Sequence, residues 1–146
     1  MHLFTDETKL NSYLDKVLKP MAHALRTHPA LAAFDIINEP AGSFAQGIND
    51  ANPCFNTEIL KGSGTDWTHT GLHIKDVQRF INHHIQVIKM YAPETLVTVG
   101  DGEQTMTNIT AHSRNYYSDH CLRLAGGKPE GVLGNKLIFK LYHDEY

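Results

Sequence analysis

A glutamate that directly follows an apolar run is the residue of this chain best suited to chemistry. Residues 31–37 have the length and composition of a buried strand, and Asn38-Glu39-Pro40 comes at once after them. Pro40 ends such a strand, because it has no N–H for the ladder and fixes its own φ. In parallel α/β enzymes the chemistry lies on the loops that follow the strands. The sequence therefore predicts that Glu39 is held at a strand tip as a catalytic carboxyl group; a glutamate that caps the next element is the alternative.

The elements that would position Glu39 alternate between helices and strands. Apolar residues spaced by three and four predict one helix between Thr5 and Pro29, kinked or interrupted at Pro20, and a second helix over residues 72–92. The predicted apolar face of the first helix consists of Leu10, Tyr13, Leu14, Val17, Leu18, Met21, Ala22 and Leu25. The predicted buried face of the second consists of Ile74, Val77, Phe80, Ile81, His84, Ile85 and Ile88. Short apolar runs predict strands over residues 30–38, 96–100 and 136–143. Alternation of this kind implies parallel pairing through right-handed crossovers, so the expected fold class is α/β.

Two long irregular segments follow the predicted strands rather than the helices. They span residues 41–70 and 101–135, the second with a short helix near residues 117–124. Long loops in a compact domain are more often functional than structural. Their placement puts the elaborated loops on one face, as in a (β/α)-barrel enzyme.

The composition describes a folded chain without an evident nucleic-acid or membrane partner. The 146 residues are 41% hydrophobic and 20% charged, with a formal net charge of −3 when the ten histidines are neutral. There is no basic stripe to bind a phosphate backbone. No stretch approaches the roughly 18 to 20 consecutive apolar residues of a membrane span. The first residues lack the basic region and apolar run of a signal peptide, so either the protein is intracellular or Met1 is not the start of a secreted precursor.

The residues around Glu39 carry a family resemblance. Residues 31–40 resemble the fourth-strand motif of glycoside hydrolase family 5, in which an Asn-Glu-Pro triplet holds the acid/base glutamate. Residues 13–21, 96–100 and 114–122 are similar to the endo-β-1,4-mannanase branch of that family. The resemblance extends over nearly the whole chain.

The resemblance implies a partial (β/α)8 TIM barrel. The family folds as an eight-stranded barrel of about 250 residues or more, and this chain holds what look like strands four to six with their helices. Residues 1–146 are therefore expected to be a single incomplete catalytic-domain fragment. By analogy the nucleophilic glutamate lies on the seventh strand, beyond Tyr146.

The implied reaction is retaining hydrolysis of β-1,4-linked mannan. Retaining glycosidases hold two carboxyl groups roughly 5–5.5 Å apart, one to protonate the leaving oxygen and one to attack the anomeric carbon. Glu39 takes the acid/base role, with its pKa raised by burial and by the second carboxylate. A β-1,4-glucanase of the same family remains an alternative. The other alternative is a catalytically inactive, truncated scaffold with only weak sugar binding.

Several further residues are candidates for contact with a sugar. Asn38 could donate a hydrogen bond to a hydroxyl beside the scissile bond, or it could be a turn residue. The family has a His-X-Tyr pattern after the sixth strand; His143 fits it, but Glu145 takes the tyrosine position and Tyr146 comes one residue later. Trp67, and more weakly Phe44, could stack on a sugar face or pack the barrel rim. Glu103 and Asp101 could contact sugar hydroxyls. The resemblance does not support Asp101, Glu103, Asp144 or Glu145 as the nucleophile.

The cysteines and histidines suggest a crosslink rather than a metal site. Cys54 and Cys121 fall in loops after neighbouring strands, so a disulfide could join two loops on one face, with two free thiols as the alternative. His69 and His73 are four apart and His83 and His84 are adjacent, but no third ligand is signalled, so no metal is predicted. No Walker-type loop or dinucleotide fingerprint is present, and no cofactor is expected. The resemblance implies a secreted, monomeric parent enzyme with a polysaccharide substrate.

Overall fold

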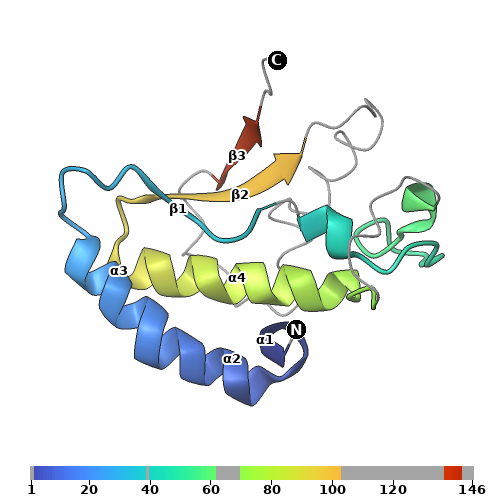
Figure 1. The fold of residues 1–146 in the computed structure, drawn as a ribbon, viewed down its shortest axis with the longest axis horizontal. Coiled ribbons are helices and arrows are strands. Elements are labelled where there is room, and N and C mark those ends of the chain that lie inside the picture. The colour runs from blue at the N-terminus through green and yellow to red at the C-terminus, as the bar shows by residue number, and fades with distance from the viewer. Residues whose placement is uncertain (1, 39, 62–69, 103–136, 143–146) are drawn as a thin grey trace.

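Three parallel strands form the sheet of this protein. The computed structural model describes residues 2–38, 40–61, 70–102 and 137–142, and of residues 101–102 and 137–142 it describes the backbone alone. The strands are β1 (Ala33–Asp35), β2 (Leu96–Gly102) and β3 (Leu137–Tyr142), and they lie in the order β1-β2-β3. The register pairs Asp35 with Thr98 and Thr98 with Ile138. The predicted parallel α/β arrangement is confirmed for this part of the chain (Figure 1).

Strand β1 is shorter than the predicted strand over residues 30–38. Only three of its residues have regular strand geometry, yet hydrogen bonds to β2 continue beyond them. The N–H of Ile36 donates to the carbonyl of Thr98 over 3.0 Å, and the N–H of Gly100 donates to the carbonyl of Ile37 over 2.9 Å. The backbone therefore stays tied to β2 as far as Ile37, directly before Asn38.

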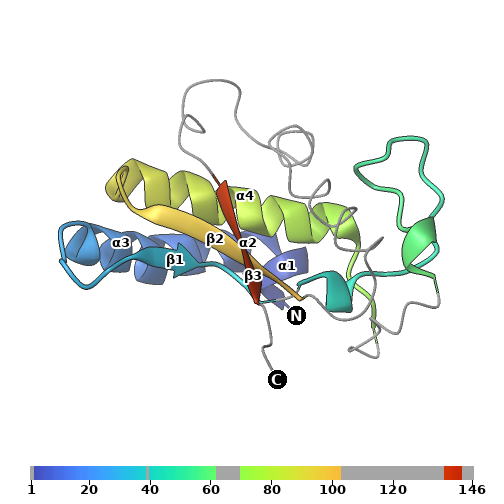
Figure 2. The ribbon, with the colours of Figure 1, turned by 90° about the horizontal axis from the view of Figure 1, so that it is seen from above.

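Helix α4 (Ile74–Tyr91) connects β1 to β2 and packs beneath the sheet. The apolar face that its sequence predicts is the face that the structure buries. Its buried members are Ile74, Val77, Phe80, Ile81, His84, Ile85 and Ile88. In Figure 1 the N-terminal helices lie on the same side of the sheet, and Figure 2 shows the sheet in front of both helical segments.

The N-terminal segment is helical almost throughout, but a wider turn precedes Pro20. It consists of α1 (His2–Thr5), α2 (Glu7–Tyr13), the π-helix η1 (Leu14–Leu18) and α3 (Lys19–Leu25). Pro20 lacks the N–H of an ordinary helical turn, and its ring would clash with the carbonyl four residues earlier. The N–H of Lys19 instead bonds the carbonyl of Leu14, five residues back. The interruption expected at Pro20 is thus a single π-bulge rather than a break.

This wider turn changes which residues of the N-terminal segment face the core. Its buried residues follow each other at intervals of four: Leu10, Leu14, Leu18 and Ala22. Val17 and Met21, which the three-four spacing placed on the same face, are 47% and 38% exposed. The prediction was wrong for these two side chains, because a π-turn rotates the residues within it and after it relative to a regular helix.

The segment predicted as a loop over residues 41–70 contains short ordered elements as far as it is described. These are the 3₁₀ helices η2 (Pro40–Ser43) and η3 (Glu58–Leu60). Phe44 forms an isolated parallel bridge with Leu72, just before α4. The N–H of Ala45 donates to the carbonyl of Leu72 over 2.8 Å, which fixes the start of the loop against the approach to α4.

Candidate active site

Asn38 lies at the carboxyl end of the sheet, where the sequence predicts the site. It follows the last hydrogen bond between the β1 segment and β2, which joins Ile37 to Gly100. Its side chain is exposed. A primary amide offers two donors and an acceptor, so in this position it can bond a hydroxyl-rich ligand. Asn38 can therefore take the sugar-binding role that the resemblance implies.

Glu39, the predicted acid/base, lies outside the described residues. Its neighbours in sequence are described: Asn38 is exposed, while Pro40 is buried and begins η2. The predicted strand reached Asn38 and was stopped by Pro40; regular strand geometry instead ends at Asp35, and the bonds to β2 extend as far as Ile37. The position of the Glu39 carboxyl group stays a prediction.

A closed loop over residues 47–57 stands beyond the end of the strands (Figure 1). Its two ends are joined by backbone bonds from Gly47 to Thr57, 3.0 Å, and from Thr57 to Ile48, 2.8 Å. The fully buried Thr57 hydroxyl donates to the carbonyl of Ala45 over 2.7 Å and accepts from the N–H of Ile48 over 3.1 Å. Gly47 has φ +70°, a conformation that suits glycine. These bonds close the neck of the loop.

Short side chains inside the loop replace regular secondary structure. Carboxylate or amide oxygens accept from the N–H two residues on, in the pairs Asp50–Asn52, 2.8 Å, and Asn52–Cys54, 3.0 Å. The Asn56 amide donates across the loop to the carbonyl of Asp50 over 3.0 Å. Such Asx turns satisfy backbone donors locally and hold an irregular chain in one conformation.

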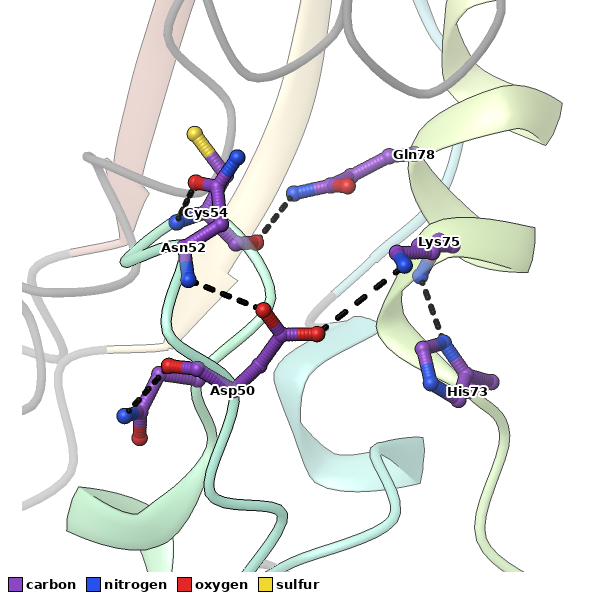
Figure 3. Close-up of polar contacts among 7 residues, drawn as sticks. Asp50, Asn52, Cys54, His73, Lys75 and Gln78 are labelled. Carbon is purple, nitrogen blue, oxygen red and sulfur yellow. Dashed lines mark hydrogen bonds and ion pairs between the residues drawn. The ribbon is translucent and has the colours of Figure 1, made fainter.

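The loop is attached to the first turns of α4 (Figure 3). Nε2 of the fully buried Gln78 donates to the carbonyl of Cys54 over 2.9 Å. Nζ of Lys75 lies 3.9 Å from the Asp50 carboxylate and 4.2 Å from the centre of the Phe55 ring. The ion pair is half-exposed and long, so the buried Gln78 bond contributes more to the attachment. The loop over residues 47–57, called the sheet-end loop below, is therefore fixed to the helix that packs under the sheet.

Cys54 lies in this loop and is buried at 2% exposure. Its sulfur is bonded in a disulfide, so the alternative of a free thiol does not apply to Cys54. The predicted partner, Cys121, lies outside the described residues, and the pairing of the two stays a prediction. A crosslink at this position adds a covalent restraint to the Gln78 bond.

The remaining candidates divide into residues that the structure does not describe and one that it excludes. Outside the described part of the chain lie Trp67, Glu103, His143 and Tyr146, together with Asp144 and Glu145. The backbone of Asp101 belongs to β2, but its side chain is not described. Phe44 is 1% exposed and part of the core, so the suggestion that it stacks on a sugar was wrong.

Two of the described histidines, His73 and His84, have structural positions. Nδ1 of His73 accepts from the N–H of Lys75 over 3.2 Å and caps α4. His69 lies outside the described residues. His84 is buried, and Nδ1 lies 2.7 Å from the carbonyl of Phe80. Burial lowers the pKa of His84 from 6.5 to about 4, against a smaller opposing effect of the Phe80 bond. Within the described ranges, no group of three or more histidine, cysteine, aspartate or glutamate side chains could hold a metal ion.

Sequence reasoning missed two residues that shape this end of the sheet. Thr57 and Gln78 are polar side chains at fully buried positions, and each bonds backbone of the loop. Gln78 lies in the helix beside the predicted apolar face, and a polar residue there signals a buried hydrogen bond. The sequence gives no indication of its partner, because Cys54 lies 24 residues away.

The chain is similar to β-mannanases in both sequence and structure. It is 42% identical over 131 residues to a mannan endo-1,4-beta-mannosidase of Mytilus edulis, a match that covers 90% of this chain and 36% of that protein. It superposes on the β-mannanase of the blue mussel Mytilus edulis with a TM-score of 0.81 and 39% identity, covering 96% of this chain and 39% of the other. The β-1,4-mannanase of the sea hare Aplysia kurodai gives a TM-score of 0.77 at 41% identity, over 90% of this chain and 37% of the other.

These matches confirm the resemblance to endo-β-1,4-mannanases. The chain spans about a third of the length of the curated relatives it matches. No protein-family model matches it. Within the described residues, no helix is both long enough and apolar enough to cross a membrane.

Proposed function

We propose that this chain, a homologue of endo-β-1,4-mannanases, is the part of a retaining β-mannanase of glycoside hydrolase family 5 that carries the general acid/base, Glu39. The proposed fold of the whole is a (β/α)8 barrel, to which β1, β2 and β3 contribute strands four, five and six. The nucleophile comes from a later strand. Residues 1–146 form one incomplete catalytic domain in this proposal.

The observation that carries the proposal is the exposed Asn38 at the carboxyl end of a parallel sheet, in a chain about 40% identical to named mannanases. In parallel α/β folds this is the edge where substrates bind. Glu39 is the next residue, and Asn38-Glu39-Pro40 carries the family resemblance. The acid must protonate the bridging oxygen of the polymer, and the Asn38 amide would bond a neighbouring sugar hydroxyl.

The proposed substrate is β-1,4-linked mannan, bound without a cofactor. The homologues at 38–42% identity are named for hydrolysis of this linkage, which favours mannan over glucan. The proposed location is extracellular, with a monomeric enzyme. The disulfide at Cys54 supports that location, since disulfides persist in oxidising compartments.

Replacement of Glu39 in the protein at its natural length tests the acid/base role. Glu39→Ala should lower kcat on mannan by about 10²–10⁴-fold, the usual contribution of general acid–base catalysis. An aryl β-mannoside with an activated leaving group needs little protonation, so bond cleavage should suffer far less in single-turnover measurements. Equal losses on both substrates would refute the acid role.

A control carboxylate is available at the opposite end of the sheet. Glu94 is exposed and precedes β2, whereas Glu39 follows β1. Glu94→Gln should leave both rates within about twofold of the unaltered protein, the usual outcome for a surface change away from a site. A comparable loss in Glu94→Gln would show that the Glu39→Ala effect reflects general damage rather than lost proton transfer.

A further inference from the structure

Gly100 interrupts a strand whose other residues favour strand structure. It stands inside β2 after Val97, Thr98 and Val99, all of them β-branched and all buried. Glycine in a strand interior weakens the strand, by roughly 0.5–1 kcal/mol relative to alanine. Its φ is not in the left-handed region; Gly47 alone among the described glycines has a positive φ. Backbone conformation therefore does not explain the glycine at position 100.

The close approach of Asn38 explains the glycine instead. A Cβ atom at position 100 would lie 2.7 Å from Oδ1, 3.1 Å from Cα and 3.5 Å from Cγ of Asn38. Ordinary van der Waals contacts begin at 3.4 Å, so the Asn38 oxygen would have to retreat by roughly 0.7 Å. The N–H of Gly100 also holds the carbonyl of Ile37, which prevents the two segments from separating freely. Glycine in a strand often marks such a close approach.

We propose that Gly100 is a positioning residue for Asn38 in the reaction assigned above. This inference rests on the proposed function. The missing side chain lets the Asn38 amide lie against β2 in one orientation. Any larger residue moves the amide that would bind the sugar, and Glu39 is the next residue along the backbone. Gly100 acts through Asn38 and need not touch the substrate.

The test compares Gly100→Ala, Asn38→Ala and the double variant in the protein at its natural length. Gly100→Ala should lower kcat/KM on mannan by about tenfold to a hundredfold, because misplacement by a fraction of an ångström to 1 Å has effects of this size. In the double variant, Oδ1 and Cγ are gone from the contact. The added alanine should then cost less than it does in the unaltered background. Losses that simply multiply would overturn the proposal, since independent sites behave in that way.

Gly71 provides a matched control. A Cβ there would meet the backbone of Ala45 at 2.6 Å, a clash at least as severe, but away from Asn38. Gly71→Ala should lower the Tm without coupling to Asn38→Ala in kcat/KM. If Gly71→Ala couples to Asn38→Ala as strongly as Gly100→Ala does, the effect is general loosening and the proposal fails.

An NMR measurement separates this proposal from the proposed function. The side-chain amide resonance of Asn38, assigned by its loss in Asn38→Ala, should shift in Gly100→Ala and stay in place in Gly71→Ala. A protein without mannan hydrolysis would refute the proposed function, yet the resonance would still decide the role of Gly100. An unmoved resonance in Gly100→Ala would overturn that role even in an active enzyme.

A compensating substitution tests whether Gly100→Ala fails to fold because of Asn38. Should Gly100→Ala fail to fold, Asn38→Gly in the same protein removes every side-chain atom that the alanine would meet, and folding should return. If the double variant also stays unfolded, the obstacle at position 100 is not the Asn38 side chain, and the inference is wrong.

Discussion

His84 should make the stability of this protein sensitive to mild acid. His84 is 3% exposed, and its ring centroid lies 4.0 Å from that of Phe80 and 5.6 Å from that of Tyr13. Burial away from water disfavours the charged imidazolium. The resulting pKa in the folded protein is about 4, compared with 6.5 for an unperturbed histidine. The neighbouring His83 also disfavours a charge on His84 when it is protonated itself.

The direction of the effect follows from proton binding in the two states. Below pH 6.5 the unfolded chain takes up a proton at His84 that the folded protein resists until the pH nears 4. Acid therefore favours unfolding across this window, and the contribution of neutral His84 is fully present only above pH 6.5. At 1.36 kcal/mol for each pKa unit, the whole window corresponds to about 3 kcal/mol. Between pH 7 and pH 5 the loss should be about 2 kcal/mol.

Urea unfolding of the unaltered protein and of His84→Phe at pH 7 and pH 5 measures this difference. The phenylalanine keeps an aromatic ring beside Phe80 and Tyr13 but cannot bind a proton. The unfolding free energy of His84→Phe, relative to that of the unaltered protein, should be about 2 kcal/mol higher at pH 5 than at pH 7. The same replacement at the exposed His2 serves as the control. An NMR titration that finds His84 half-protonated near pH 6.5 in the folded protein would refute the reasoning.

The sheet-end loop over residues 47–57 and the unpaired edges of the described sheet give three further predictions. Gln78→Leu removes the buried donor to the Cys54 carbonyl and should lower the free energy of unfolding by about 1–3 kcal/mol. Amide exchange over residues 47–57 should become faster. The control Gln86→Leu, on the same helix, should not affect that loop. Gly47→Ala places a side chain at φ +70° and should cost roughly 1–2 kcal/mol in thermal unfolding; an unchanged Tm would show that the loop readjusts. Residues 1–146 expressed alone should give no turnover of mannan and should aggregate, because the sheet edges and the exposed Val17 and Met21 side chains lack partners within the described part. Turnover by this polypeptide that disappears in Glu39→Gln would contradict that expectation.

Local patterns in the sequence determined the parallel α/β class and the placement of Asn38 after a strand. The apolar spacing of α4 identified its buried face, including His84, and the run before Asn38 identified the segment that pairs with β2 as far as Ile37. Such patterns record which side of an element is buried, and this information is contained within a few neighbouring residues. The predicted location of Asn38 at a strand end needed nothing more.

Contacts between distant segments were decided by the tertiary structure. The burial of Phe44 depends on its pairing beside Leu72, and the role of Gln78 depends on a carbonyl in another segment. The π-turn before Pro20 moved Val17 and Met21 out of the face that their spacing predicted. The approach of Gly100 to Asn38 depends on the register of two strands. Periodicity does not say which distant segments meet, because these contacts are set by packing of the whole chain.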